Sequence, residues 1–197
     1  MPQLWVFAGP NGSGKSTVTR KVIDIAPGVY INADLIQEKL GCSAMEAALN
    51  AEETREYYLE LNEDFTFETV LSTDRNLNLM QRAKEQGYEI TCFYVITNNP
   101  KINVTRVEKR ARLGGHDVPT EKVWSRYLRC MNLLPSLLPV CDHLLIFDNS
   151  GEQGTGTASV IVYAEGGEIV EIKPNAMWSE SDIRALLEGS YGVRFQQ

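Results

Sequence analysis

The chain has few cysteines and none of the long apolar runs that mark membrane proteins. Its four cysteines, Cys42, Cys92, Cys130 and Cys141, stand far apart and form no Cys-x-x-Cys pair, which argues against a zinc site and against a disulfide framework. No apolar stretch approaches the length of a membrane span. The first residues also lack the basic region and cleavage pattern of a secretion signal. We therefore expect a cytoplasmic protein with reduced thiols and no membrane partner.

Positive charge is also scarce. The 197 residues include 19 Lys and Arg against 26 Asp and Glu, which gives a net charge of −7. Proteins that bind nucleic acids usually carry an excess of basic residues, so this balance argues against DNA or RNA as a partner. The exception is a local basic patch between Lys101 and Arg129, which needs an explanation of its own.

Short apolar or β-branched segments alternate with helical segments over residues 1–148. The predicted strands are residues 4–8, 29–31, 65–71, 88–97 and 142–148. The predicted helices are residues 15–25, 44–62, 77–86, 102–112 and 120–138. This alternation is typical of an α/β fold with an open, mostly parallel sheet and helices on both faces.

The character of the sequence changes after residue 150. A Gly- and Thr-rich loop is predicted over residues 151–157, followed by a hairpin around Gly166-Gly167 and a short helix that begins after Ser179. We expect residues 1–150 to form the core, with two lid-like helices near residues 101–130. Residues 151–197 are then a small hairpin and helix appended to the same domain.

A phosphate-binding motif follows the first predicted strand. The segment Gly9-Pro10-Asn11-Gly12-Ser13-Gly14-Lys15-Ser16 matches G-x-x-x-x-G-K-[ST], and it opens a helix as the P-loop mechanism requires. Backbone N–H groups and the helix dipole would hold the phosphates of ATP or GTP, Lys15 would reach the β- and γ-phosphates, and the Ser16 hydroxyl would ligate Mg²⁺. The predicted nucleotide-binding residues are Gly9, Asn11, Gly12, Ser13, Gly14, Lys15, Ser16 and Thr17.

Two other classes of P-loop protein fit the sequence less well. An ABC-type ATPase needs an LSGGQ signature and a strand ending in Asp-Glu, but this chain has only Leu113-Gly114-Gly115-His116 and Asp148-Asn149. A GTPase needs an NKxD-type base-reading motif, which is missing. A kinase of small molecules needs an acceptor-orienting carboxylate, polar groups that hold the acceptor, and arginines that close over the transferring phosphate.

Asp34 is the candidate for the acceptor-orienting carboxylate. It lies just past the carboxyl end of the second predicted strand, and ligands bind at that edge of an open α/β sheet. We predict that Asp34 is the general base and contacts the acceptor. The alternative is a helix N-cap for residues 35–40, and one residue can fill both roles.

Glu68 is a carboxylate inside an otherwise apolar strand. A buried carboxylate is costly unless it is paired or functional, so Glu68 is predicted to bind acceptor hydroxyls or the Mg²⁺ shell. The alternative is simple alternation, with Glu68 on a solvated face. The polar residues that follow at the end of this strand are further candidates for acceptor contacts: Thr69, Ser72, Thr73 and Arg75.

The basic patch lies on two predicted helices joined by Gly114-Gly115-His116-Asp117. Two arginine-bearing helices with a Gly-rich joint are typical of a lid that closes guanidinium groups over the γ-phosphate. We predict catalytic roles for Arg110, Arg112 and Arg126, in addition to Lys15 and Asp34. The alternative is a solvated helical hairpin.

In combination, these segments resemble the zeta toxin family of P-loop kinases. The resemblance rests on Gly9–Thr17, Ile31–Asp34, Phe67–Thr73, Arg106–Pro119, Arg126-Tyr127 and Asp148-Asn149-Ser150, in family order. It implies a fold close to that of small-molecule kinases such as chloramphenicol phosphotransferase, and phosphorylation of the sugar of UDP-N-acetylglucosamine or a similar nucleotide sugar. It also implies an antitoxin protein as a partner.

Two functional hypotheses follow from the sequence. The first is a phosphotransferase that uses ATP or GTP with Mg²⁺ and a small-molecule acceptor. The second is a nucleotide-dependent ATPase or switch that transfers no phosphate to a metabolite and acts through a protein partner. In the second hypothesis, Asp34 and Glu68 have structural roles only.

Overall fold

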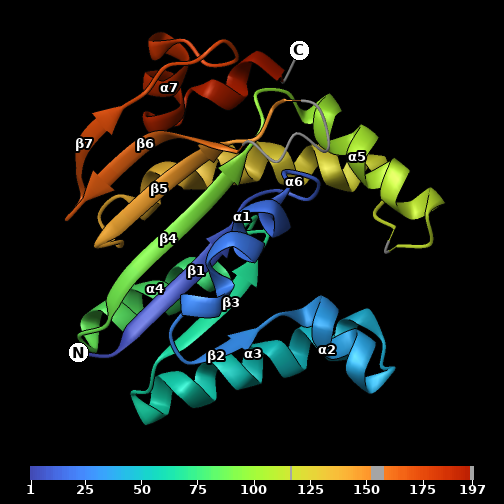
Figure 1. Cartoon of the computed structure of the whole chain (residues 1–197), viewed down its shortest axis with the longest axis vertical. Helices are drawn as coiled ribbons and strands as arrows, with labels where there is room; N and C mark the ends of the chain where they lie inside the picture. The colour runs from blue at the N-terminus through green and yellow to red at the C-terminus, as the bar shows by residue number, and fades with distance from the viewer. Residues whose placement is uncertain (116, 152–157, 196–197) are drawn as a thin grey trace.

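A computed structural model describes residues 1–115, 117–151 and 158–195, and one seven-stranded sheet lies at its centre (Figure 1). The strands lie in the order β2-β3-β1-β4-β5-β6-β7. They are β1 Gln3–Ala8, β2 Val29–Ile31, β3 Phe65–Thr69, β4 Glu89–Ile96, β5 His143–Asp148, β6 Ser159–Glu165 and β7 Glu168–Ile172. The first five strands pair in parallel, and the last two are antiparallel. The predicted fold class is confirmed.

Helices cover both faces of the sheet. They are α1 Lys15–Val22, α2 Ala33–Leu40, α3 Ala44–Leu61, α4 Asp74–Glu85, α5 Pro100–Arg112, α6 Thr120–Leu133 and α7 Glu180–Leu187. Figure 1 shows α1 on the near side of the sheet and α4 and α6 behind it. Two helices are shorter than predicted. The last residues predicted for α1 form the 3-10 turn η1 (Ile23–Ile25), and α6 is followed by the 3-10 turn η2 (Leu134–Leu137), which contains Pro135.

The alternation of side chains along β1 divides the core into two layers. Leu4, Val6 and Ala8 face a large apolar cluster that includes residues of α3, α4, α6 and α7. Phe7 faces the opposite side, where it stacks on Phe93 at 5.0 Å between ring centroids and packs with residues of α1. Because β1 is interior and buried on both faces, the P-loop that follows it starts from a fixed point.

The C-terminal hairpin continues the main sheet and is not a separate layer. β6 pairs with β5, and β7 pairs with β6. Residues 152–157, which make up most of the predicted loop, lie outside the described residues. In the described part of the chain, no helix combines the length and the apolar character that crossing a membrane requires.

A buried carboxylate connects this C-terminal part to the core. Asp148 ends β5, is 5% exposed, and accepts hydrogen bonds from four donors. They are the backbone N–H of Ser150 at 2.8 Å, the Ser150 hydroxyl, Asn175 Nδ2 at 2.9 Å and Trp178 Nε1 at 3.0 Å. Asp148 therefore resembles the carboxylate of an ABC-type ATPase only in its position at the end of a strand, because its oxygens accept hydrogen bonds that hold the fold together.

We predict that Asp148→Ala destabilises the fold strongly. The change leaves several buried donors without an acceptor, which should cost roughly 2–4 kcal/mol of unfolding free energy. Urea unfolding followed by circular dichroism measures this value, with Glu165→Ala at the exposed end of β6 as the control. A loss below that of the control would show that Asp148 is not a structural anchor.

Candidate active site

The P-loop connects β1 to α1 through a backbone path that requires glycine. Gly9 has φ +138°, and a Cβ there would lie 2.1 Å from the carbonyl oxygen of Val95. Gly12 has φ +75°, and a Cβ there would lie 2.4 Å from the carbonyl oxygen of Asn103. The loop is therefore pressed against β4 and α5, in a conformation that other residues rarely adopt.

Side chains from outside the loop hold its carbonyl groups. Asn103 Nδ2 donates to Asn11 O at 2.7 Å, and Asn149 Nδ2 donates to Ser13 O at 2.8 Å. Arg106 Nη1 lies 3.5 Å from both Gly12 O and Ser13 O. Arg106 also donates to the carbonyl of Gly151 at 2.7 Å and is 9% exposed. With these carbonyls engaged by α5 and by the segment after β5, the start of α1 can present backbone N–H groups to an anion.

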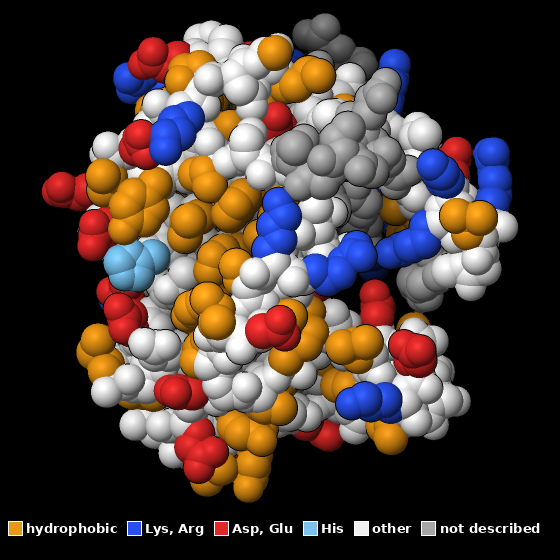
Figure 2. Space-filling model, in the orientation of Figure 1, with side chains coloured by type: hydrophobic (Ala, Val, Ile, Leu, Met, Phe, Trp, Pro, Cys, Tyr) orange, Lys and Arg blue, Asp and Glu red, His pale blue; other side chains and the backbone are white. Residues whose placement is uncertain are grey.

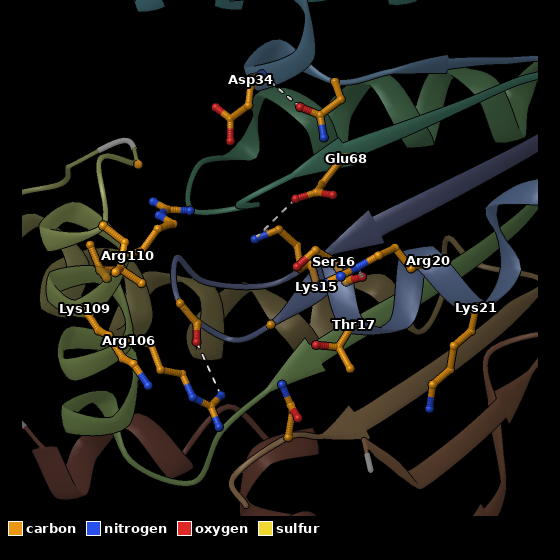
Figure 3. A pocket seen from close by; sticks show the side chains of 17 residues that line it. Lys15, Ser16, Thr17, Arg20, Lys21, Asp34, Glu68, Arg106, Lys109 and Arg110 are labelled. Atoms are coloured by element: carbon orange, nitrogen blue, oxygen red, sulfur yellow. Dashed lines mark hydrogen bonds and ion pairs between the residues drawn. The ribbon is translucent and has the colours of Figure 1, made fainter. Parts of the chain in front are cut away.

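Lys15 lies at the floor of the site and is 8% exposed. Its ammonium group donates to Gly9 O at 2.9 Å and to Pro10 O at 3.4 Å, and Glu68 Oε1 lies 4.0 Å away (Figure 3). Lys15, predicted to bind the phosphates, and Glu68, predicted to bind the acceptor or the Mg²⁺ shell, are thus brought together from α1 and β3, although they lie far apart in the sequence.

Glu68 lies in a hydrogen-bonded network and not on a freely solvated face. Its side chain is 20% exposed, and its Oε2 accepts from the Tyr30 hydroxyl at 3.0 Å. Asn32 Nδ2 donates to the same hydroxyl at 3.0 Å. Burial, and then the negative charge of Glu68, raise the pKa of Tyr30 well above its usual value, so Tyr30 remains a neutral donor that fixes the carboxylate.

Asp34 lies in the first turn of α2, but it is not the cap of that helix. The cap is Asn32, whose Oδ1 accepts from the backbone N–H groups of Asp34 at 2.8 Å and Leu35 at 3.3 Å. The capping alternative for Asp34 is therefore wrong. The Asp34 side chain is exposed and points into the cleft that also contains Glu68 and Lys15 (Figure 3).

Two adjoining clefts meet at these residues. The first, of about 1010 Å³, extends along α1 and α5, and the second, of about 930 Å³, extends between α3 and the loop after β3. The residues that line both are Gly12, Lys15, Asn32, Asp34, Glu68 and Arg110. Figure 2 shows a hollow here, with Lys and Arg side chains along the α5 wall and acidic side chains across from them.

All of the predicted acceptor contacts line the second cleft. They are Asp34, Glu68, Thr69, Ser72, Thr73 and Arg75. The Arg75 side chain is 70% exposed and pairs with Glu52 at 2.7 Å. Leu71, which lies between Thr69 and Ser72 in the sequence, has φ +53°. This is a strained conformation for a branched residue, and it turns the chain sharply at the end of β3.

The predicted lid arginines separate into two groups. Arg110 lines both clefts, and Arg126 lines the second and donates to Asn11 Oδ1 at 3.1 Å. Arg112 is exposed and lines neither cleft, so the structure does not bring it together with the other predicted residues. His116, in the joint between the two helices, lies outside the described residues.

Among the predicted P-loop residues, Gly9 and Ser13 are buried and line neither cleft. They shape the loop, whereas Gly14, Ser16 and Thr17 line the first cleft. Several residues at the site had no role assigned from sequence: Arg20, Lys21, Asn32, Arg55, Asn103, Arg106, Lys109 and Asn149. Arg106 and Lys109 belong to the basic patch that the sequence shows, but the contacts of Arg106 with the P-loop could not be predicted from the sequence.

We predict that Arg106→Met weakens nucleotide binding by about 10-fold or more, because charge-assisted contacts with two loop carbonyls and with Gly151 are lost. Arg112→Met, on the same helix, is the matched control and should bind nucleotide like the parent. Calorimetric titration with ATP and Mg²⁺ measures both affinities. Equal losses in the two variants would mean that only the overall charge of α5 matters.

Comparison with known proteins gives the following similarities. The sequence model of the family described as zeta toxin matches residues 1–154. An uncharacterized protein of Haemophilus influenzae is 28% identical, with 64% of this chain and 97% of that protein covered. A solved structure of the PezAT chromosomal toxin–antitoxin system of Streptococcus pneumoniae is 16% identical, with a TM-score of 0.56 and coverage of 100% of this chain and 88% of that one.

A higher structural similarity is found with the AvrRxo1-ORF1:-ORF2 complex. The native structure has a TM-score of 0.70 at 16% identity and covers 100% of this chain. This chain spans only 66% of the chain that it matches there, and 61% in the structure of the complex with ATP. At such identities the structural likeness shows the fold alone, whereas the family match covers most of the sequence. The chain belongs to the zeta toxin family.

Proposed function

We propose that this protein is a P-loop kinase that transfers the γ-phosphoryl group of ATP to a hydroxyl group of a small acceptor. The observation that carries the proposal is the meeting of two clefts at Lys15, Asp34, Glu68 and Arg110. The first cleft contains the start of α1 and would hold the triphosphate. The second extends away from it toward α3 and would hold the acceptor, so the two reactants would touch at the shared residues.

The described residues of the first cleft fit a nucleotide with Mg²⁺. The loop presents a cradle that a Cβ at Gly9 or Gly12 would disrupt, and Lys15 and Ser16 line or underlie it. Among the described residues, no three His, Cys, Asp or Glu side chains come together as a metal site. Mg²⁺ would therefore depend on the Ser16 hydroxyl and phosphate oxygens, with Glu68 as the nearby carboxylate, and when bound it would neutralise charge on the phosphates.

We propose that Asp34 activates the acceptor. A hydroxyl in the second cleft would donate its hydrogen bond to the Asp34 carboxylate while its oxygen faces the γ-phosphorus. As the new P–O bond forms, the bond from the γ-phosphorus to the β,γ-bridging oxygen breaks, ADP leaves, and the hydroxyl proton passes to Asp34. Lys15 and Arg110 would stabilise the charge on the transferring group.

For the acceptor, we propose a nucleotide sugar such as UDP-N-acetylglucosamine. The support is membership of the family and a second cleft with both polar and apolar walls. We also propose a protein antitoxin as partner, since two structural neighbours, PezAT and AvrRxo1-ORF1:-ORF2, are two-component complexes.

We predict that Asp34→Asn retains ATP affinity and stability but lowers phosphoryl transfer by roughly 10²–10⁴-fold, the usual range for a general base. The helix cap is unaffected because it is Asn32, so the variant removes only charge and basicity at Asp34. ATP affinity is measured by calorimetry, and transfer by mass spectrometry with UDP-N-acetylglucosamine or another acceptor.

Glu38→Gln is the matched control, since Glu38 lies on the exposed side of the same helix and lines neither cleft. Full transfer activity in Asp34→Asn would remove Asp34 from the mechanism and leave Glu68 as the next candidate. Transfer lost together with ATP affinity would also contradict the proposed role, because the carboxylate would then support the nucleotide.

We predict that Arg110→Ala and Arg126→Ala affect turnover more than nucleotide affinity. Each removes a guanidinium near the junction of the clefts, so kcat should fall by about 10²-fold in at least one of them. Steady-state kinetics with saturating ATP measure this change, and Arg112→Ala should stay close to the parent. Unchanged kcat for both Arg110→Ala and Arg126→Ala would favour a solvated helical hairpin.

A further inference from the structure

A buried arginine interrupts the apolar stripe of α3. The buried positions of this helix are Ala47, Ala51, Arg55 and Leu59, which follow one another at intervals of four residues along the face that packs on the sheet. Arg55 is 7% exposed, although its neighbours on the stripe are alanine and leucine. A charged side chain at such a position is costly unless something compensates for its lost hydration.

The contacts of Arg55 within the described residues do not provide that compensation. Its guanidinium carbon lies 5.2 Å from the centre of the Phe67 ring, and its Nε is buried without a hydrogen-bond partner in the described part of the chain. Burial lowers the pKa of the guanidinium, although Glu52 and Glu56 act in the opposite direction. Arginine nevertheless stays charged in proteins, so the Arg55 guanidinium is a cation on the buried face of α3 whose lost hydration is only partly replaced.

Both nearby carboxylates are engaged by other arginines. Glu52 pairs with Arg75 at 2.7 Å, and Glu56 pairs with Arg82 at 2.5 Å. Both glutamates are half-buried, whereas Arg55 is buried with its guanidinium over the Phe67 ring. Neither carboxylate therefore accepts a hydrogen bond from the Arg55 guanidinium.

Arg55 also lies on the wall of the second cleft. Phe67, beneath it, directly precedes Glu68 and Thr69, which line the same cleft. Small residues of α3, Ala48 and Ala51, line the cleft beside it and leave room for a ligand. A buried cation whose Nε has no hydrogen-bond partner among the described residues, at the wall of a cleft with polar and apolar residues, is an arrangement that can bind an oxyanion.

We propose that Arg55 forms an anion-binding subsite of the second cleft, so that the molecule held there carries a phosphate or carboxylate group. The identification of that molecule as the phosphoryl acceptor rests on the function proposed above. Arg55 would then bind the acceptor at a group other than the reacting hydroxyl and would offset the repulsion between an anionic acceptor and the triphosphate. It would act as a specificity residue that selects anionic over neutral acceptors.

The test measures anion binding directly, with the P-loop filled by a non-hydrolysable ATP analogue and Mg²⁺ so that the probe cannot bind there. Inorganic phosphate and acetate are titrated separately by calorimetry, and the stronger of the two identifies the anionic group. Arg55→Met and Arg55→Gln should each weaken binding of that anion by about 10- to 100-fold, since a charge-assisted contact is lost. Arg184→Met, an exposed arginine of α7 that pairs with Glu180 and lines neither cleft, is the control and should bind the anion like the parent.

Thermal unfolding provides a second readout that separates binding from structure. Removing an uncompensated buried charge should leave the melting temperature of Arg55→Met unchanged or raise it. Equal anion affinity in the parent and in the folded Arg55 variants, or no saturable anion binding by the parent, would overturn the proposal. A lowered melting temperature in both variants with unchanged anion affinity would instead assign Arg55 a structural role.

These outcomes are independent of the test of the kinase reaction. If phosphate transfer to an acceptor is observed but anion binding does not depend on Arg55, only the subsite is wrong. If anion binding depends on Arg55 but no acceptor is ever phosphorylated, the subsite stands and the proposed reaction fails.

Discussion

The site depends on the hydrogen bonds that hold the carbonyl groups of the P-loop. Asn103 and Arg106 of α5 and Asn149 after β5 engage three successive carbonyls of the loop. This has two physical consequences. The loop is held in a conformation in which the N–H groups at the start of α1 remain for phosphate oxygens. In addition, α5 is attached to the loop at its inner end, so Arg110, one turn further along, lines the same cleft as the loop.

The parallel sheet brings the remaining groups to this point. β1 and β3 are neighbours, with Phe7 opposite Glu68, so the P-loop and the acidic end of β3 leave the sheet side by side. β2 lies on the other side of β3. Tyr30 lies within β2, and Asp34 lies in the first turn of α2, which follows β2. Ligands of open α/β sheets bind at this edge, and here the edge is divided into the first cleft, along α1 and α5, and a second cleft whose far wall is α3.

Residues that are adjacent in sequence were predictable, whereas contacts between distant segments were not. The P-loop is a contiguous motif, and the position of Asp34 after a strand followed from local pattern alone. Which arginine of α5 faces the cleft depends on helix phase: Arg106 and Arg110 lie one turn apart on one face, and Arg112 points away. The cap at Asn32 and the pairing of β6 with β5 depend on local hydrogen-bond geometry and on long-range pairing that residue types do not specify.

The burial of Arg55 could not be predicted from the sequence, although the spacing of Arg55 from its neighbours on α3 was visible there. Its spacing from Ala47, Ala51 and Leu59 indicates one helical face, yet only the packing of α3 on the sheet shows that this face is buried. A charge run on a long helix is usually solvated, and α3 contains several other charged residues that are exposed.

The central claim is that the γ-phosphoryl group passes to a small molecule and not to water. The most direct measurement supplies the protein with ATP labelled in the γ-phosphoryl group and a cell-metabolite extract, followed by mass spectrometry, with Lys15→Ala as the inactive reference. The account predicts that the parent transfers the label to a hydroxyl-bearing metabolite and that Lys15→Ala does not. Release of the label only as inorganic phosphate, at equal ATP turnover, would contradict the account and favour a nucleotide-dependent switch.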